Sequence, residues 1–271
     1  MKLSIALLAF LAATTLQAQE HSLEKLWSTD SNIAVPESVL PANGILYIAL
    51  IDGGGWDADG KGGVAKLGLD GKNYEASWIT GLNAPKGMGI VGNRMYVADI
   101  TEVVVIDIAK GKIEKKIAID SAKGLNDITV TDNGIVYVSD SRTAKIWRIE
   151  NDAATLYLED MKGVNGLRAV GEDLIIASGK SFIKADAQKN IKKIADLPQG
   201  GDGIEPVGNG DYIVTSWPGY IFYVYADGKI ETILETHLEK KNTADIGYDP
   251  IKRIVYVPTF NAKTVVAYRL K

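Results

Sequence analysis

Apolar and polar positions follow their clearest pattern in residues 124–160. Four short apolar or alternating runs lie there, separated by polar turn residues: 128–131, 135–139, 143–149 and 154–158. Asn133 and Gly134 separate the first two runs, and Asn-Gly between apolar runs is typical of a β-hairpin turn. The stretch therefore predicts a four-stranded antiparallel sheet of about 40 residues, the size of one propeller blade.

Five more units align with this one. Each begins with one residue, polar in all but the last unit, followed by a small or acidic residue and an apolar run. The aligned first residues are Glu37, Lys86, Asn126, Asn165, Asp202 and Ala244. Their spacings of 49, 40, 39, 37 and 42 residues describe a repeat with one insertion. A β-branched and aromatic run follows a turn in each unit, as is typical of buried strands.

The two ends of the chain indicate how these units close into a ring. The sixth unit is one strand short because the chain ends after residues 264–270, whereas residues 23–30 belong to no unit. We expect this N-terminal strand to complete the last blade and remove the open edge of the ring. The sequence thus predicts an all-β, six-bladed β-propeller of four-stranded antiparallel blades, with residues 20–271 as a single domain. Residues 236–241 suggest one helical turn at most.

Residues 1–19 have the pattern of a secretory signal peptide. Lys2 precedes an apolar stretch at residues 3–13, and a more polar end follows, with Ala18 near the expected cleavage site. The apolar stretch is short for a spanning helix, and an uncleaved anchor is the alternative. We therefore expect a periplasmic or secreted protein with no membrane span in the mature chain.

Charge and composition narrow the expected partners. The net charge of −4 argues against binding to nucleic acid or anionic membranes. The chain has no cysteine, which excludes disulfides, thiolate catalysis and cysteine-based zinc sites. Its two histidines are far apart, His21 near the start and His237 in a late polar loop. We expect a small-molecule partner, and the sequence does not define a protein partner.

The six aligned residues are expected to meet at one mouth of the central channel, because the first strands of the blades surround the axis of a propeller. Convergent polar groups in a hollow are typical of a binding site. Glu37, Asn165 and Asp202 offer hard oxygen atoms, which suit calcium or magnesium better than a soft metal. Alternatively, these side chains only cap strand ends, where Asn and Asp are common.

Two segments contain unit starts in full: NDITVTDNGIVYVSDS at residues 126–141 and DGIEPVGNGDYIVTSW at residues 202–217. Together with the other unit starts, they resemble the SMP-30/gluconolactonase/LRE family of six-bladed propellers. The resemblance covers the mature chain and implies hydrolysis of a lactone. It implies that Glu37, Asn165 and Asp202 bind one divalent cation, calcium first, with magnesium, manganese or zinc as alternatives. Asn126 would contact metal or substrate, and Asp202 would act as base on a water while the cation polarises the carbonyl.

The chain departs from the family pattern at three positions. Gly124 stands where some members carry a basic substrate contact. Lys86 adds a positive charge to the ring, where it could balance Glu37 or Asp202, hold a substrate carboxylate or occupy the place of the cation. Ser38 replaces an acid expected for a second ion in the channel, so we expect one ion.

The insertion in the first unit, residues 51–63, falls on the same side of the ring as the aligned residues. Its G-x-x-x-x-G-K spacing lacks the Ser or Thr and the helix of a phosphate-binding loop, so we interpret that match as chance. We expect instead a flap with Trp56 available to stack on a ligand; the alternative is a solvated loop with Trp56 packed on the rim. Trp217 and Phe260 in other loops are expected to form an apolar wall for a sugar or lactone ring.

The leading hypothesis is a secreted, metal-dependent hydrolase of a small lactone or ester. The alternative is a non-catalytic propeller that binds a small ligand or a protein through the same mouth, which Lys86 and Gly124 favour. A third possibility is an interaction module in which the ring holds no metal.

Overall fold

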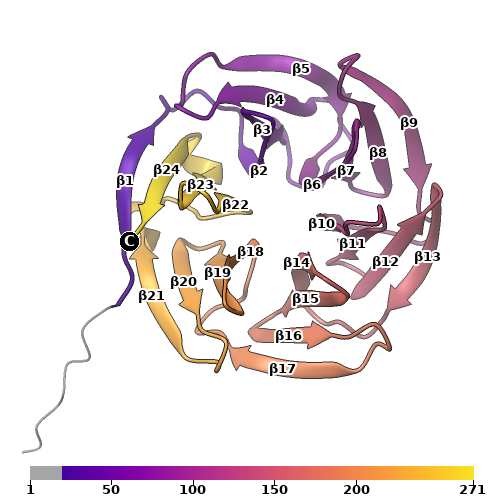
Figure 1. Ribbon diagram of the computed structural model, residues 1–271. Helices are drawn as coiled ribbons and strands as arrows, with labels where there is room; N and C mark the ends of the chain where they lie inside the picture. Colours follow the sequence, from indigo (N-terminus) through magenta and orange to yellow (C-terminus); the bar gives the residue numbers. More distant parts are fainter. Residues whose placement is uncertain (1–19) are drawn as a thin grey trace, which may run out of the picture.

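The computed structural model describes residues 20–271, so the expected signal peptide lies outside the described residues. The described chain forms six four-stranded antiparallel sheets around a central axis (Figure 1). Blade one comprises β2 (Pro36–Ala42), β3 (Ile45–Leu50), β4 (Gly62–Gly68) and β5 (Glu75–Leu82); blade two β6 (Pro85–Val91), β7 (Arg94–Asp99), β8 (Glu102–Asp107) and β9 (Lys112–Ala118); blade three β10 (Leu125–Val130), β11 (Val136–Asp140), β12 (Lys145–Glu150) and β13 (Ala153–Leu158); blade four β14 (Val164–Val170), β15 (Asp173–Ser178), β16 (Ser181–Ala185) and β17 (Ile191–Asp196); blade five β18 (Ile204–Gly208), β19 (Asp211–Ser216), β20 (Tyr220–Val224) and β21 (Ile230–Glu235); blade six β22 (Gly247–Asp249), β23 (Ile254–Pro258), β24 (Val265–Leu270) and β1 (Leu23–Ser28).

The ring closes as the sequence predicts. Strand β1 pairs antiparallel with β24 in the order β1-β24-β23-β22, so the two ends of the chain share blade six. The fold class is confirmed. Helical structure within residues 20–271 is limited to two short 3₁₀ turns, His237–Glu239 inside the expected stretch and Phe260–Ala262. No helix in the same residues is long and apolar enough to cross a membrane.

Strand boundaries in blade three differ slightly from those read in the sequence. Strand β10 begins at Leu125 rather than at residue 128 and ends at Val130. It starts earlier because the backbone of Leu125 bonds to Ile100 of blade two. Gly134 makes the turn at φ 86°, as the Asn-Gly signal indicates.

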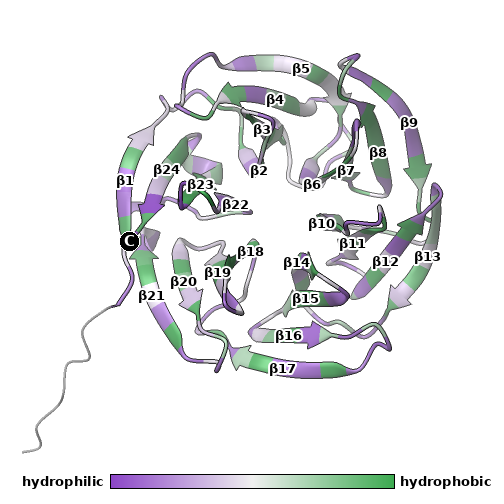
Figure 2. Ribbon diagram, in the orientation of Figure 1, coloured by the Kyte–Doolittle hydropathy of each residue, from purple (hydrophilic) through white to green (hydrophobic). Residues whose placement is uncertain are grey.

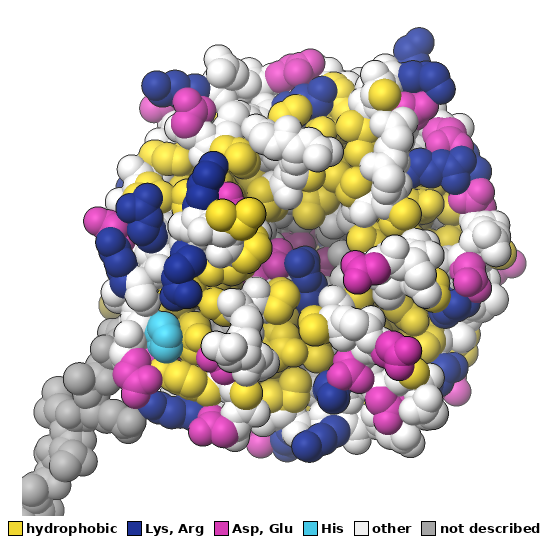
Figure 3. All heavy atoms as spheres, in the orientation of Figure 1, with side chains coloured by type: hydrophobic (Ala, Val, Ile, Leu, Met, Phe, Trp, Pro, Cys, Tyr) yellow, Lys and Arg dark blue, Asp and Glu magenta, His cyan; other side chains and the backbone are white. Residues whose placement is uncertain are grey.

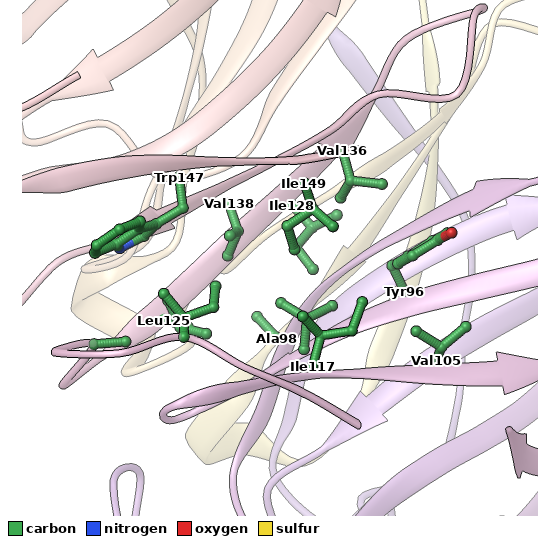
Figure 4. Close-up of a cluster of buried hydrophobic side chains, with 13 residues drawn as sticks. Tyr96, Ala98, Val105, Ile117, Leu125, Ile128, Val136, Val138, Trp147 and Ile149 are labelled. Atoms are coloured by element: carbon green, nitrogen blue, oxygen red, sulfur yellow. The ribbon is translucent and has the colours of Figure 1, made fainter. Parts of the chain in front are cut away.

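The apolar core lies between neighbouring blades. Side chains alternate across a strand, so each blade presents one apolar side to the blade before it and one to the blade after it. Figure 4 shows this packing between blades two and three, where Ala98 and Ile117 lie opposite Val138 and Ile128. The inner strands are the more apolar: β8 is almost wholly hydrophobic, whereas the outermost β9 mixes polar and apolar residues (Figure 2). Apolar packing between blades therefore holds the innermost strands in place, and with them the residues that begin each blade.

Candidate functional site

Five of the six aligned residues form a polar ring around one mouth of the channel. Glu37, Lys86 and Asp202 are 7%, 3% and 5% exposed, so the ring is set below the surface. Lys86 Nζ lies 3.9 Å from Glu37 Oε1. Across the ring, Asn165 Nδ2 donates to Asp202 Oδ1 at 2.8 Å. The structure therefore brings together residues that are up to 165 positions apart (37 to 202).

Contacts within blade five, and one between blades four and five, fix Asp202 in place. The N–H of Asp202 donates to the carbonyl of Thr215 at 2.8 Å. The next residue, Gly203, donates to Thr215 Oγ1, also at 2.8 Å. The backbone of Gly166 packs so closely on Asp202 that a Cβ there would overlap the carbonyl oxygen of Asp202. A small residue after the ring position thus lets two blade starts approach each other.

Asn126 is positioned differently from Asn165. Its Nδ2 donates to Ser141 Oγ at 3.0 Å, and Ser141 in turn donates to the carbonyl of Val164 at 2.7 Å. Asn126 is therefore linked through Ser141 to the backbone of blade four. These contacts use its amide nitrogen and not its amide oxygen. Ala244, the sixth aligned residue, is buried and offers no polar side chain.

Burial dominates the protonation of the two ring carboxyls. Burial raises the pKa of Glu37 to about 7, although the ammonium of Lys86 opposes this. Burial also raises the pKa of Asp202 well above its ordinary value, and the charge of Glu37 raises it further. Asp202 therefore keeps its proton to a higher pH than an ordinary carboxyl, and a cation in the ring would favour its ionised form.

Two ring oxygens have no hydrogen-bond partner among the described residues. They are Glu37 Oε2 and Asn165 Oδ1, both buried. A buried acceptor without a partner costs about 1–3 kcal/mol, and a cation or a ligand donor would satisfy both. No group of three or more His, Cys, Asp or Glu side chains in residues 20–271 is arranged as a metal site. The donor set is instead two carboxyls and an amide, which fits one hard cation completed by water or ligand.

The insertion in blade one, residues 51–63, is the segment expected to act as a flap, and it brings Trp56 against the polar ring. Lys86 Nζ lies 4.3 Å from the centroid of the Trp56 indole. The guanidinium carbon of Arg142, in the loop after β11, lies 4.8 Å from the same ring. The contacts with Lys86 and Arg142 place Trp56 at the mouth, which agrees both with a flap and with a loop whose Trp56 packs on the rim.

Sequence reasoning did not select Arg142 as a site residue. A Cβ on Gly124 would lie 2.6 Å from Arg142 Cγ, so the glycine leaves the space that Arg142 fills. The structure thus places the basic side chain of Arg142 beside Gly124. The signal in the sequence is weak, since Arg142 is an ordinary loop residue two positions after Asp140, the last residue of β11.

Trp217 and Phe260, expected to form an apolar wall, contact each other. Their ring centroids are 5.5 Å apart at an interplanar angle of 77°. Phe260 packs on the small apolar cluster of Ile51, Ala84 and Ile100 at the base of the flap. Trp217 is 43% exposed and available to a ligand. Neither histidine belongs to the ring: His21 stacks on Tyr223 and His237 on Tyr220.

A second group of charged residues fills the channel beyond the ring. It surrounds a cavity of about 20 Å³ to which the innermost strands of all six blades contribute. The charged and hydroxyl-bearing residues of this lining are Ser38, Asp127, Arg168, Glu205 and Asp245. In the space-filling view the centre of the ring is hollowed, with acidic and basic side chains inside it (Figure 3). Ser38 donates to Asp245 Oδ2 at 2.8 Å, so the residue in place of the expected acid serves as a donor.

Glu205 should make the stability of the protein depend on pH. Arg168 contacts it at 3.0 Å, yet burial raises the pKa of Glu205 to about 7. The folded state thus binds this proton more tightly than the unfolded state, and the contribution is lost as pH rises from about 4.5 to about 7. We expect Glu205→Gln to flatten the fall in unfolding free energy over this window by up to about 3 kcal/mol. Urea titrations at several pH values measure it.

Glu150→Gln, which removes an exposed carboxylate paired with Arg148, is the control and should leave the pH profile unchanged. A Glu205→Gln profile as steep as that of the wild type would contradict the assignment.

Comparison with known proteins identifies the fold but no family. No family model and no curated protein matches the sequence. A catalytically inactive variant of virginiamycin B lyase from Staphylococcus aureus, solved with quinupristin, is similar in structure. Its TM-score is 0.66 at 14% sequence identity, covering 92% of this chain and 99% of that chain. Selenomethionine-substituted virginiamycin B lyase gives a TM-score of 0.65 at 13% identity, with the same coverage.

A chain of the nidogen/laminin complex gives a TM-score of 0.66 at 12% identity, covering 77% of this chain and 86% of that chain. At these identities the similarity establishes the architecture alone. The chain is a six-bladed β-propeller of four-stranded blades.

Proposed function

We propose that the polar ring binds a small ligand together with one divalent cation, and that the protein hydrolyses a lactone or related ester there. The observation that carries this proposal is the pair of buried oxygens without partners, Glu37 Oε2 and Asn165 Oδ1, on residues next to Asp202 in the ring. Buried polar atoms normally find partners, and an unpaired one calls for a ligand or ion.

Glu37, Asn165 and Asp202 would hold the cation, with calcium suited to their hard oxygen atoms. When bound, the cation would polarise a carbonyl and acidify a water. A bound cation would favour the ionised form of Asp202, which burial disfavours, and Asp202 would accept a proton from that water. Trp56, Trp217 and Phe260 would shield the reacting group from solvent, and Asn126 would orient the ligand. The pattern of residues 1–19 supports action in the periplasm or outside the cell.

Added calcium is expected to raise the melting temperature, because an ion that binds only the folded state stabilises it. At 100 times the dissociation constant the gain is about 2.7 kcal/mol, or roughly 5–10 °C for a chain of this size. Glu37→Gln should abolish most of the shift, since it removes a charged ligand. Asp196→Asn, a change at an exposed carboxylate paired with Lys193, is the matched control and should retain it.

The rate of lactone hydrolysis, measured by proton release, should fall when a chelator is added and recover when calcium is added back. Elemental analysis of the purified protein that finds no divalent cation, with no shift on adding one and turnover indifferent to chelator, would rule out the proposed mechanism.

Non-catalytic ligand binding through the same mouth is the second candidate. Lys86 favours it, because its ammonium lies 3.9 Å from Glu37 and supplies positive charge without a metal. A melting temperature that rises with ligand in the presence of chelator, without turnover on a lactone panel, would support this function.

A further inference from the structure

We propose that a cleft between blades three and four, on the face opposite the polar ring, binds a neutral oligosaccharide. The cleft has a volume of about 640 Å³, which is within the usual range of ligand sites in proteins. Because the cleft and the polar ring are separate, this inference goes beyond the proposed function and does not depend on it.

The two ends of the innermost strands place the cleft on the face opposite the ring. Asn126 and Asn165 stand near the starts of β10 and β14. The turns that follow the ends of the same two strands, at residues 131–133 and 171–172, line the cleft. Each innermost strand runs from one face of the propeller to the other. A ligand in the cleft would therefore not reach Asp202.

The cleft is open because blade three presents a polar row of side chains to blade four. Tyr137, Arg148 and Thr155 are register partners on β11, β12 and β13, so they project from the same side of the sheet. In blade two the register partners Tyr96 and Val105 are instead buried in the apolar core. The polar row does not pack against blade four in this way, and the space beside it remains accessible.

Two tyrosines supply the aromatic surface of the cleft. The ring centroids of Tyr137 and Tyr157 lie 4.7 Å apart at an interplanar angle of 57°. Two inclined rings form a concave surface, which matches the puckered C–H face of a sugar better than it matches a planar ligand. Burial raises the pKa of Tyr157 to about 12, so its hydroxyl remains a hydrogen-bond donor.

The polar lining suits hydroxyl groups better than a charged group. Asp132 and Glu172 make no ion pair within residues 20–271, so their oxygens can accept hydrogen bonds from ligand hydroxyls. Arg148 and Asp173 also line the cleft, and each is already paired with an opposite charge, at 2.8 and 2.6 Å. Because both signs of charge are present, the lining does not select for a charged ligand, whereas hydroxyls both donate and accept.

Lys189 covers part of the aromatic surface. Its Nζ lies 4.9 Å from the centroid of the Tyr157 ring. The side chain is exposed and a single exposed cation–π contact is weak, so a sugar that packs on Tyr157 can displace it.

The shape of the cleft favours a chain of several sugars over a single one. It extends from the turns beside the innermost strands to Thr155 and Leu156 on the outermost strand β13. Leu156 is 43% exposed, so this end opens to solvent. An oligosaccharide could follow the cleft with its ends outside it.

Calorimetric titration of the full chain tests the site with cellotetraose, maltotetraose and xylotetraose, each at millimolar concentration, and with adenosine as a planar ligand. We expect at least one tetrasaccharide to bind, and to bind at least about tenfold more tightly than adenosine. Because this ligand is neutral, its affinity should not change between about 0.1 and about 1 M salt.

Variants of the cleft locate the binding. Tyr157→Ala should lower the affinity at least about tenfold, whereas Tyr157→Phe keeps the aromatic ring and should retain most of it. Glu172→Ala changes an exposed residue and should lower the affinity severalfold without unfolding the protein. Tyr74→Ala and Glu75→Ala, at the beginning of β5 in blade one, are the matched controls for a half-buried tyrosine and an exposed glutamate. Both should bind as the wild type does.

No binding of any of the three tetrasaccharides, or adenosine binding as tightly as they do, would overturn the inference. Undiminished affinity in both Tyr157→Ala and Glu172→Ala would also overturn it. Asp202→Asn should leave the affinity unchanged, and a loss of binding in this variant would place the saccharide at the polar ring instead of the cleft. Binding is measured here without turnover, so failure of lactone hydrolysis would leave this inference intact.

Discussion

Asp202→Asn is expected to lower kcat/KM for lactone hydrolysis by at least about 100-fold, the usual contribution of a general base. Asparagine keeps the shape of the side chain and the hydrogen bond from Asn165, which now measures 2.8 Å. It removes the negative charge that would hold the cation and the atom that would accept a proton. Proton-release assays across substrate concentrations separate the effect on kcat from that on KM.

The same Asp202→Asn change, which should lower activity, should preserve or raise the thermal stability of the protein. Burial raises the pKa of Asp202 well above its ordinary value, so ionising this carboxyl costs folding free energy. The neutral amide avoids this cost, and Asp202→Asn should melt at the wild-type temperature or above it in chelator. Activity lost from a protein of full stability is the pattern of a functional residue.

Glu205→Gln controls for the loss of a buried channel carboxyl, because Glu205 lies three positions further along the chain and outside the ring. It should change activity by no more than a few fold. An Asp202→Asn variant with activity close to that of the wild type would eliminate Asp202 as the base.

Gly166→Ala is expected to damage both the fold and the site. The added Cβ would overlap the carbonyl oxygen of Asp202 and approach Ile204 Cγ1 at 3.1 Å. Blades four and five would have to separate where their first strands begin, at a cost of about 3 kcal/mol, as in other overpacked interiors. Asp202 would move with its backbone, and a shift of about 1 Å at a catalytic group can cost 100-fold in rate.

Thermal unfolding and lactone assays measure the two effects together. Gly200→Ala is the matched control, because a Cβ at this nearby glycine would meet only ordinary contacts, the nearest at 3.7 Å. It should leave both quantities almost unchanged. Equal melting temperatures for the two variants would show that the blade starts are not packed as closely as described.

The location of the site followed from the repeat, but its contacts did not. Aligning the blade starts correctly predicted that Glu37, Lys86 and Asp202 would share one mouth, because equivalent positions of a closed ring face the same axis. The alignment gave no reason for Asn165 to donate to Asp202 while Asn126 donates to Ser141. Those choices depend on different neighbours: Ser141 follows the second strand of the same blade, whereas Asp202 begins the next blade.

The contacts of Arg142 were also not predictable from the sequence. Its position in the repeat, just after a second strand, is shared by many polar loop residues without a function. Only the folded chain shows that Gly124, eighteen positions earlier, leaves the space that Arg142 fills. The flap contact with Trp56, from another blade, is likewise a product of the ring.

The sequence by itself determined the strands, their grouping into six blades and the closure by β1, because alternation of side chains and tight turns are local properties of the chain. It also determined which residues begin each blade. The tertiary structure alone decided which side chains meet across the mouth, which buried oxygens are left without partners and how far burial shifts the carboxyl pKa values. Those properties arise from packing between segments distant in sequence, and local periodicity does not encode them.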